Sequence, residues 1–332
     1  MIAEASTSEA PVESFACGPL AIQLHASGVL RAKLAETLGL YDVRWDVPLI
    51  PVDVRAARAQ GPAAIATGTN LLCGRMNVDV LADGLYASTV SGCSARQCAS
   101  EGSWNIEVPD ALIAARKLEE LEDILSLVLT EGWRAAGWVP LHAAAVERDG
   151  RCAIVCAPTG GGKTTLTASL VRTGWRTLGD DKLLLRVQNR EPELAALLHT
   201  FNLHPRTRQW FPEVGPLERL PRYSAWTDKR KVRATAIWPG IGALRARPTR
   251  LILLERCAGH SQVRARALTR SEILDALLRQ TVIPRDPRRA APIVRTIAAT
   301  AGGIGGVRLE IGTGAYAGGA ALASIERAIG EL

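Results

Sequence analysis

Residues 141–185 read LHAAAVERDGRCAIVCAPTGGGKTTLTASLVRTGWRTLGDDKLLL, and this stretch predicts the fold of the chain. Within it, an apolar run over 152–156 is short enough to be a buried strand. Three consecutive glycines follow at 160–162, and residues 163–173 then carry leucines at helical spacing. A glycine-rich turn between a strand and the first turn of a helix is the context in which phosphate-binding loops occur.

The residues of this turn have the chemistry that binding a nucleoside triphosphate requires. Glycines allow positive φ and bring several N–H groups toward one anion at a helix N-terminus. Lys163 would reach the β- and γ-phosphates of ATP, and the Thr164 hydroxyl would bind Mg²⁺. The alternative is a glycine-rich connector that binds nothing, which the intact Gly-Lys-Thr disfavours. We therefore predict ATP and Mg²⁺ as cofactors, with nucleotide contacts from Thr159, Gly160, Gly161, Gly162, Lys163, Thr164 and Thr165.

Two adjacent acids, Asp180 and Asp181, follow the next predicted strand, seventeen residues after Lys163. A carboxylate beside a phosphate-binding loop can hold Mg²⁺ or accept the proton of an attacking hydroxyl. The alternative is a turn with two solvated acids. Farther along, the basic run at 228–231 either places a cation on a transferring phosphoryl group or forms an ordinary surface turn.

Composition limits the partners that we expect. The chain has 332 residues, of which 47% are hydrophobic, enough for two domains. A net charge of +7 favours anionic partners, but few aromatics and no known binding motif argue against nucleic acid. No apolar stretch approaches the length of about eighteen residues that a membrane span needs. With seven scattered cysteines and no signal peptide, the chain is predicted to be cytoplasmic, without a membrane partner.

Residues 1–135 read as a mixed α+β module that ends in a bridging helix. A short helix is predicted over 28–40, and a longer one over 110–133 with Asp110 as its cap and Gly132 as its end. Short strands are expected at 20–24, 43–47, 71–73 and 76–80.

Residues 136–332 are predicted to form the nucleotide-binding domain. A strand over 141–147 would join the strand at 152–156 through an Asp-Gly hairpin turn. No long periodic element appears between 199 and 234, which suggests loops over the site. Later elements are expected to be a central strand at 251–254, helices at 271–280 (capped by Ser271), 288–300 and 318–331, and an outer strand at 307–311.

These motifs resemble the HPr kinase/phosphorylase family and its relatives, the HPr-kinase-like peptide and protein kinases. The matching features are Leu141-His142, the turn at Asp149-Gly150, the loop at 160–165 and the pair Asp180-Asp181, in this order. Phosphoenolpyruvate carboxykinases have a similar Gly-Lys-Thr-Thr-Leu loop. The resemblance covers about residues 135–190. It implies an α/β fold, a P-loop kinase domain of the HPr kinase/phosphoenolpyruvate carboxykinase type beside the mixed α+β N-terminal module.

The resemblance also implies roles for individual residues. Lys163 would hold the ATP phosphates, Thr164 and Asp181 the metal, and Asp180 would take the proton from the acceptor hydroxyl. His142 would lie near the phosphates as a third catalytic residue, although a lone histidine in an apolar strand is also compatible with a core position.

The expected activity is an ATP-dependent transfer of the γ-phosphate to a hydroxyl of a peptide or small protein, a Ser or Thr side chain, as in the modification of peptide natural products. Other functions stay open: a small-molecule kinase acting for instance on serine, a plain NTPase, or a nucleotide-binding regulator without catalysis. A homo-oligomer is left open as well.

Overall fold

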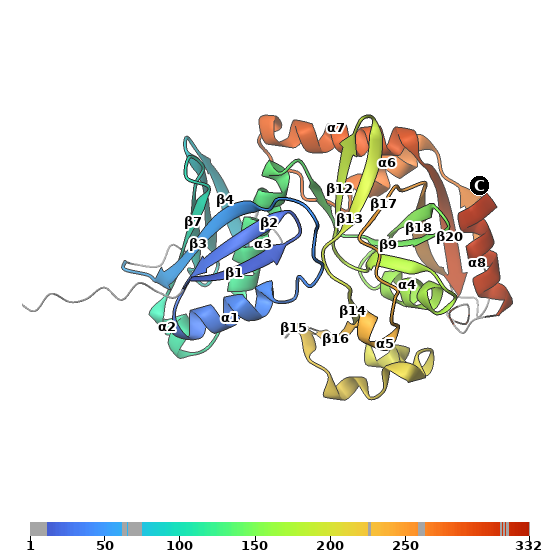
Figure 1. Cartoon of the computed structure of the whole chain (residues 1–332), viewed down its shortest axis with the longest axis horizontal. Helices are drawn as coiled ribbons and strands as arrows, with labels where there is room; N and C mark the ends of the chain where they lie inside the picture. Colours follow the sequence, from blue (N-terminus) through green and yellow to red (C-terminus); the bar gives the residue numbers. More distant parts are fainter. Residues whose placement is uncertain are drawn as a thin grey trace, which may run out of the picture. The chain divides into compact units, whose positions relative to one another are not determined.

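The computed structural model describes residues 12–61, 65, 75–224, 227–257, 263–312, 314, 316 and 319–331. The chain forms two compact units, Met1–Ala136 and Gly137–Leu332, and each mixes helices with strands (Figure 1). The strand predicted at 71–73 lies outside the described residues. No helix among the residues described is long and apolar enough to cross a membrane.

The first unit is built on a seven-stranded sheet in the order β1-β2-β3-β7-β6-β5-β4. Strand β3 runs parallel to both of its neighbours, β2 and β7, and the other neighbouring strands pair antiparallel. Helix α1 (Gly28–Leu38) joins β2 to β3 and buries three leucines at helical spacing. The strands are β1 (Val12–Cys17), β2 (Leu20–His25), β3 (Ile50–Arg58), β4 (Met76–Leu81), β5 (Gly84–Thr89), β6 (Ser94–Cys98) and β7 (Ser103–Val108).

Two of the elements predicted for this unit are wrong. Residues 43–47 form no strand but an irregular connection. Its alternating side chains Val43 and Trp45 are nevertheless buried, which explains why the sequence pattern resembles that of a strand. The helix predicted over 110–133 is broken at Arg116, which has a φ of 53° that no α-helix accommodates.

The break leaves α2 (Asp110–Ala114) and α3 (Glu120–Ala135). Asp110 is the first residue of α2 and caps nothing. Gly132 does not end α3 but lies inside it, where an added Cβ would come within 2.6 Å of Leu20 Cδ1. Close packing therefore explains that glycine.

The described residues of the second unit form three sheets. The largest has the order β11-β9-β10-β18-β20-β19, with β10, β18 and β20 parallel. Its strands are β9 (Ala144–Arg148), β10 (Arg151–Cys156), β11 (Arg176–Gly179), β18 (Arg250–Cys257), β19 (Val263–Ala267) and β20 (Gly305–Gly312). The other two sheets are antiparallel. One has the order β17-β13-β12-β8 and consists of β8 (Val139–Leu141), β12 (Leu183–Gln188), β13 (Glu191–Ala196) and β17 (Arg245–Ala246). The other has the order β14-β16-β15 and consists of β14 (Thr200–Leu203), β15 (Arg222–Ser224) and β16 (Thr227–Arg233).

Helices cover these sheets. Helices α4 (Lys163–Arg172) and α8 (Ala320–Glu331) share an apolar core with the six-stranded sheet. Helix α7 (Pro287–Gly303) lies along β12 and β13, and α6 (Arg270–Leu278) packs against α7 and β20 (Figure 1). The small three-stranded sheet packs on the other side of α4 together with short helices η1 (Pro205–Gln209), η2 (Pro212–Val214), η3 (Leu217–Arg219) and α5 (Ala234–Ile237).

Three predictions about the strands and loops of this unit need correction. The strand predicted at 141–147 is interrupted at His142, and its halves β8 and β9 belong to different sheets. Strand β20 is not an outer strand, because β19 pairs with its free edge. Residues 199–234 are not loops alone, since they contain the three-stranded sheet. Charged residues on its strands hide the alternation that the sequence pattern depends on.

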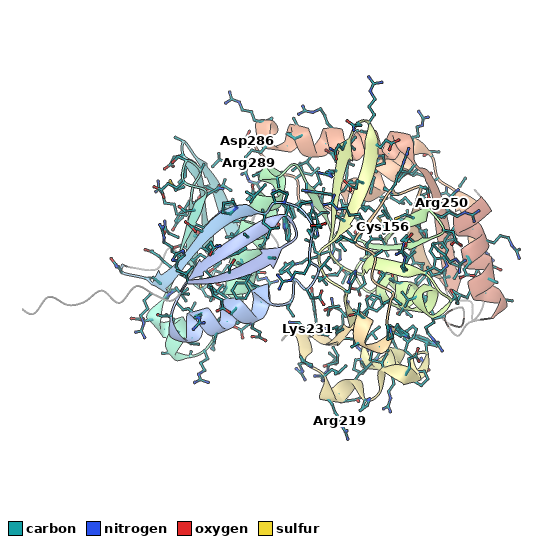
Figure 2. The ribbon with its side chains drawn as sticks, in the orientation of Figure 1. Cys156, Arg219, Lys231, Arg250, Asp286 and Arg289 are labelled. Carbon is teal, nitrogen blue, oxygen red and sulfur yellow. The ribbon has the colours of Figure 1, made fainter. Side chains whose placement is uncertain are left out.

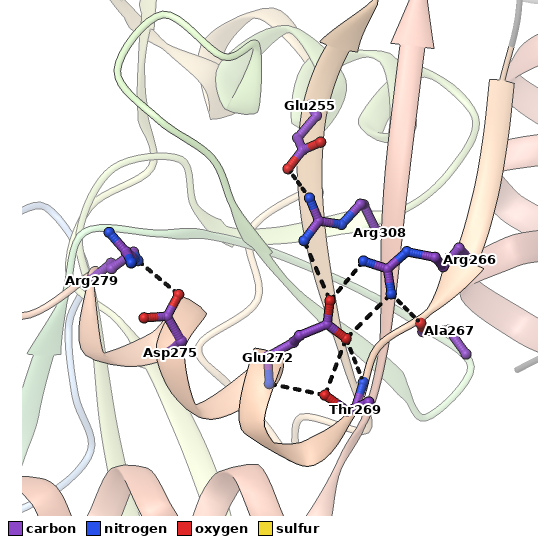
Figure 3. Close-up of polar contacts among 8 residues, drawn as sticks. All are labelled: Glu255, Arg266, Ala267, Thr269, Glu272, Asp275, Arg279 and Arg308. Atoms are coloured by element: carbon purple, nitrogen blue, oxygen red, sulfur yellow. Dashed lines mark hydrogen bonds and ion pairs between the residues drawn. The ribbon is translucent and has the colours of Figure 1, made fainter.

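The N-terminus of α6 is held by a capping box at Thr269, and the predicted cap Ser271 lies inside the helix. Thr269 Oγ1 accepts a hydrogen bond from the amide of Glu272 at 3.3 Å, and the Glu272 carboxylate accepts one from the Thr269 amide at 2.9 Å. Arg266 and Arg308 donate to the same carboxylate and tie the helix to β19 and β20 (Figure 3).

We predict that Thr269→Ala lowers the free energy of unfolding by about 1 kcal/mol, the usual value of an N-cap side chain. Urea denaturation followed by circular dichroism measures this change. Thr269→Ser is expected to retain the wild-type value, and Ser271→Ala to stay within about 0.5 kcal/mol of it. A larger loss from Ser271→Ala than from Thr269→Ala would contradict the assignment of the cap.

Candidate active site

The glycine-rich loop joins the end of β10 to the start of α4. Gly160 and Gly162 have φ of 75° and 98°, in the left-handed region that favours glycine. The amide of Gly161 donates to the carbonyl of Pro158 at 2.9 Å and closes a tight turn before the helix. The loop thus leads directly into the N-terminus of α4, which is the arrangement expected of a phosphate-binding loop.

A tyrosine from the C-terminal part of the chain packs against the loop. An added Cβ at Gly162 would lie 2.4 Å from the Tyr316 hydroxyl oxygen, so that this position has no room for a side chain. The Tyr316 hydroxyl is buried and finds no hydrogen-bond partner among the described residues. Burial raises the pKa of Tyr316 to about 12, which keeps the hydroxyl neutral at physiological pH.

Lys163, the first residue of α4, folds back over the loop. Its Nζ donates to the carbonyl oxygen of Ala157 at 3.0 Å and lies 3.4 Å from Nε2 of His142. Burial lowers the pKa of Lys163, and the charge of Asp181 opposes that change. The contact to residue 157 is made through the main-chain carbonyl and does not depend on the side chain there.

His142 lies where the chain leaves β8 and enters β9, and its amide donates to the carbonyl of Gln280 at 2.7 Å. Its side chain is 53% exposed, which a core histidine would not be, and its Nδ1 lies 3.2 Å from Asp181 Oδ1. Although the side chain is half exposed, partial desolvation of the ring, opposed by the charge of Asp181, lowers the pKa of His142, which favours the neutral ring. Lys163, His142 and Asp181 thus form one polar chain, and its geometry fits a neutral ring whose Nδ1–H donates to the acid and whose Nε2 accepts from the ammonium.

Asp180 is the most buried acid of the site, with only 1% of its surface exposed. Its Oδ2 accepts a hydrogen bond from the amide of Asn202 at 3.2 Å, and its Oδ1 is buried without a partner among the described residues. Burial first, and the neighbouring charge of Asp181 second, raise the pKa of Asp180 to about 7. The Thr164 hydroxyl, the Asn202 amide and Lys229 partly offset this rise.

Asp181 is more accessible, with 18% of its side chain exposed. The hydroxyl of Tyr223, on β15, donates to its Oδ2 at 3.4 Å. The small sheet therefore contacts both acids, Asp180 through the main chain of β14 and Asp181 through the side chain of β15.

The oxygen atoms around Asp180 suit a magnesium ion. Among the described residues, no three His, Cys, Asp or Glu side chains converge as a metal site. The unpartnered Oδ1 of Asp180 and the nearby Thr164 hydroxyl are, however, the hard oxygen donors that Mg²⁺ prefers. The Thr164 hydroxyl forms a hydrogen bond with Asp180. The family resemblance instead implies Thr164 and Asp181 as the two metal ligands.

Several residues of the site cannot be predicted from sequence motifs. Arg256, at the end of β18, donates from Nη1 to the carbonyl of Gly160 at 3.4 Å. It reaches the loop because β18 is the parallel neighbour of β10, with Leu253 opposite Cys156. The remaining residues of this kind are Asn202, Tyr223 and Tyr316, and none of them belongs to a recognisable local motif.

The basic run at 228–231 lies on β16, and its residues differ in role. The charge of Lys229 lowers the pKa of His142 and of Lys163, so this lysine faces the site. Arg230 instead donates to the carbonyl of Leu220 and stabilises the turn beneath the sheet.

Comparison with known proteins gives little beyond the geometry. No family model matches the chain, and no curated protein matches it. Among solved structures, the Hpr(Ser) kinase/phosphatase from Coxiella burnetii is similar over 52% of this chain and 85% of its own, at 9% identity and a TM-score of 0.28. A TM-score this low does not establish a shared fold or function, so the proposed function rests on the site itself.

We predict that Asp180→Asn stabilises the protein at alkaline pH. The folded-state pKa of about 7 exceeds the ordinary value of 3.8, so the free energy of unfolding falls as the pH rises from about 4 to 7 and stays low above it. Asparagine does not ionise and therefore removes this loss of stability. The loss is at most about 4 kcal/mol, because the pKa rises from 3.8 to about 7 and one pKa unit corresponds to about 1.4 kcal/mol.

Thermal unfolding at pH 5 and pH 8.5 measures this effect. The Tm of Asp180→Asn should exceed that of the wild type by several degrees at pH 8.5, and by much less at pH 5. A lower Tm of the variant at pH 8.5 would contradict the raised pKa of Asp180.

Proposed function

We propose that this protein is an ATP-dependent, Mg²⁺-assisted kinase of the HPr-kinase-like P-loop type that phosphorylates a hydroxyl, a Ser or Thr side chain of a peptide or small protein. One observation supports this proposal above the others. A glycine loop suited to phosphate lies beside a buried carboxylate whose pKa of about 7 suits a general base.

The loop accounts for binding of the nucleotide. The amides of residues 159–165 and the positive end of α4 would surround the phosphates of ATP. Lys163 would exchange its bond to the Ala157 carbonyl for the β- and γ-phosphates. Arg256, next to the loop, adds a second cation on the same side of the sheet. This arrangement favours a triphosphate over an uncharged ligand.

The acid pair accounts for transfer. The acceptor hydroxyl loses its proton to Asp180 while its oxygen forms a bond to the γ-phosphorus of ATP. The bond between that phosphorus and the bridging oxygen breaks, and ADP leaves with the electron pair. Asp180 would then carry the proton in a site where burial favours the protonated acid.

The polar chain through His142 positions the other charges. Neutral His142 holds Asp181 through Nδ1 and faces the ammonium of Lys163 through Nε2, and so fixes the spacing of acid and cation. Thr164 and Asp181 would hold Mg²⁺, which neutralises charge on the phosphates when it is bound, and Asp180 would keep its free oxygen for the proton. Positioning and charge neutralisation supply most of the rate in this class of reaction.

Assays with radiolabelled ATP distinguish the proposed kinase from its alternatives. Label on a peptide supports the proposal, label on a metabolite such as serine indicates a small-molecule kinase, and label only in free phosphate indicates an NTPase. Tight ATP binding with no turnover in Mg²⁺ would indicate a regulator.

We predict that Lys163→Ala and Asp180→Asn each lower the transfer rate by at least about a hundredfold, as expected for loss of a phosphate-binding cation or a general base. Initial rates of peptide labelling measure the change, with circular dichroism to show an intact fold. Arg295→Ala, on the exposed face of α7, is the control and should keep the wild-type rate. Full activity in either site variant would refute the assignment.

The transfer rate is also predicted to depend on pH through Asp180. Because only the deprotonated acid accepts a proton, kcat/KM should rise about tenfold per pH unit below pH 7 and level off above it. Peptide labelling between pH 5 and 9 at saturating Mg²⁺ measures the profile. A rate that falls as the pH rises through 7 would show that Asp180 acts in its protonated form.

A further inference from the structure

The small sheet β14-β16-β15 has one apolar face and one polar face. Phe201 pairs with Val232, and both side chains are buried against α4 and the short helices. The next pair is Asn202 with Lys231, which must point to the opposite face because side chains alternate along a strand. Lys229, two residues before Lys231, lies on that same face.

This polar face adjoins the acids of the candidate site. The amide of Asn202 donates to Asp180, and the hydroxyl of Tyr223 donates to Asp181. The charge of Lys229 acts on His142 as well as on Asp180. We call Asn202, Tyr223, Lys229 and Lys231 the acceptor face.

The acceptor face carries the positive charges of Lys229 and Lys231. Residues 199–234 contain eight Lys and Arg but three Asp and Glu, so this segment holds much of the positive charge of the chain. In the described part of the chain, no carboxylate forms an ion pair with Lys229 or Lys231. Figure 2 shows Lys231 on the sheet, whereas Arg219 projects outward from the short helices.

Two neighbouring carboxylates disfavour any anion that approaches them, because like charges at short range repel. The two lysines of the acceptor face attract anions instead. The part of an acceptor that lies over the small sheet is therefore expected to be negatively charged. The nucleotide has its own cations at the loop, Lys163 and Arg256. The lysines of the acceptor face therefore serve the other substrate.

We infer that the acceptor face binds an acidic peptide segment, with Asp or Glu residues flanking the hydroxyl that receives the phosphate. This inference rests on the proposed kinase function and names its substrate class. The outer strand β15 ends the small sheet, so an extended peptide can also pair with its main chain.

The test compares three synthetic peptides of eleven residues, each with one central Ser, flanked by Asp and Glu, by Ala and Gln, or by Lys and Arg. We expect the full-length protein to label the acidic peptide with a kcat/KM at least about tenfold above that of the neutral one, and the basic peptide least. Equal labelling of all three would overturn the inference and leave the kinase function intact.

Charge reversal locates the binding surface. Lys231→Glu should raise KM for the acidic peptide about tenfold, while KM for ATP stays within about twofold. Arg219→Glu is the matched control, with the same charge change in the same segment but a side chain that projects away, and KM should not move. Recovery of labelling when Lys231→Glu is given the basic peptide would show that the residue contacts the acceptor. An equal rise in KM for both variants would mean that only net charge matters.

A binding assay distinguishes this inference from the proposed function. Fluorescence anisotropy with a labelled acidic peptide, its Ser replaced by Ala, reports binding without transfer. Binding that Lys231→Glu abolishes, with no labelling of the Ser peptide, would support the acceptor face and refute the kinase. Displacement of the peptide by a single-stranded oligonucleotide of lower Kd would show instead that the face binds nucleic acid.

Discussion

The site depends on one buried charge, the carboxylate of Asp180. Burial and the adjacent Asp181 raise its pKa to about 7, so the folded protein tolerates this acid at a cost in stability. The amide of Asn202 donates to its Oδ2, and among the described residues its Oδ1 has no hydrogen-bond partner. An oxygen so placed is available to a metal ion or a proton, which is why the proposed chemistry centres on this residue.

The surrounding charges are organised by a break in the chain. If residues 141–147 formed one continuous strand, His142 would lie within a sheet. Instead the chain passes from β8 in one sheet to β9 in another, and the histidine is left half exposed between Lys163 and Asp181. The bond from its amide to the Gln280 carbonyl holds this turn. A backbone irregularity thus connects the glycine-rich loop to the acid pair.

The small sheet gives the site its second side. Its apolar face packs on α4, the helix that begins with Lys163, so loop and sheet share one rigid element. Its polar face brings Lys229 and Tyr223 to the acids. In the proposed function, the nucleotide would therefore bind on the side of the loop and the acceptor on the side of the sheet.

The sequence alone determined the strand, the glycine turn and the helix with Lys163 and Thr164, because these depend on a short apolar run and on residues adjacent in the chain. It also determined the hairpin at Asp149-Gly150, where both residues have positive φ. Only the tertiary structure decided that Asn202 and Tyr223 meet the acid pair, that Arg256 and Tyr316 contact the loop, and that His142 leaves the sheet. Those contacts join residues 22 to 154 positions apart, for example Asp180 with Asn202 and Gly162 with Tyr316, and no local periodicity encodes a pairing over such separations.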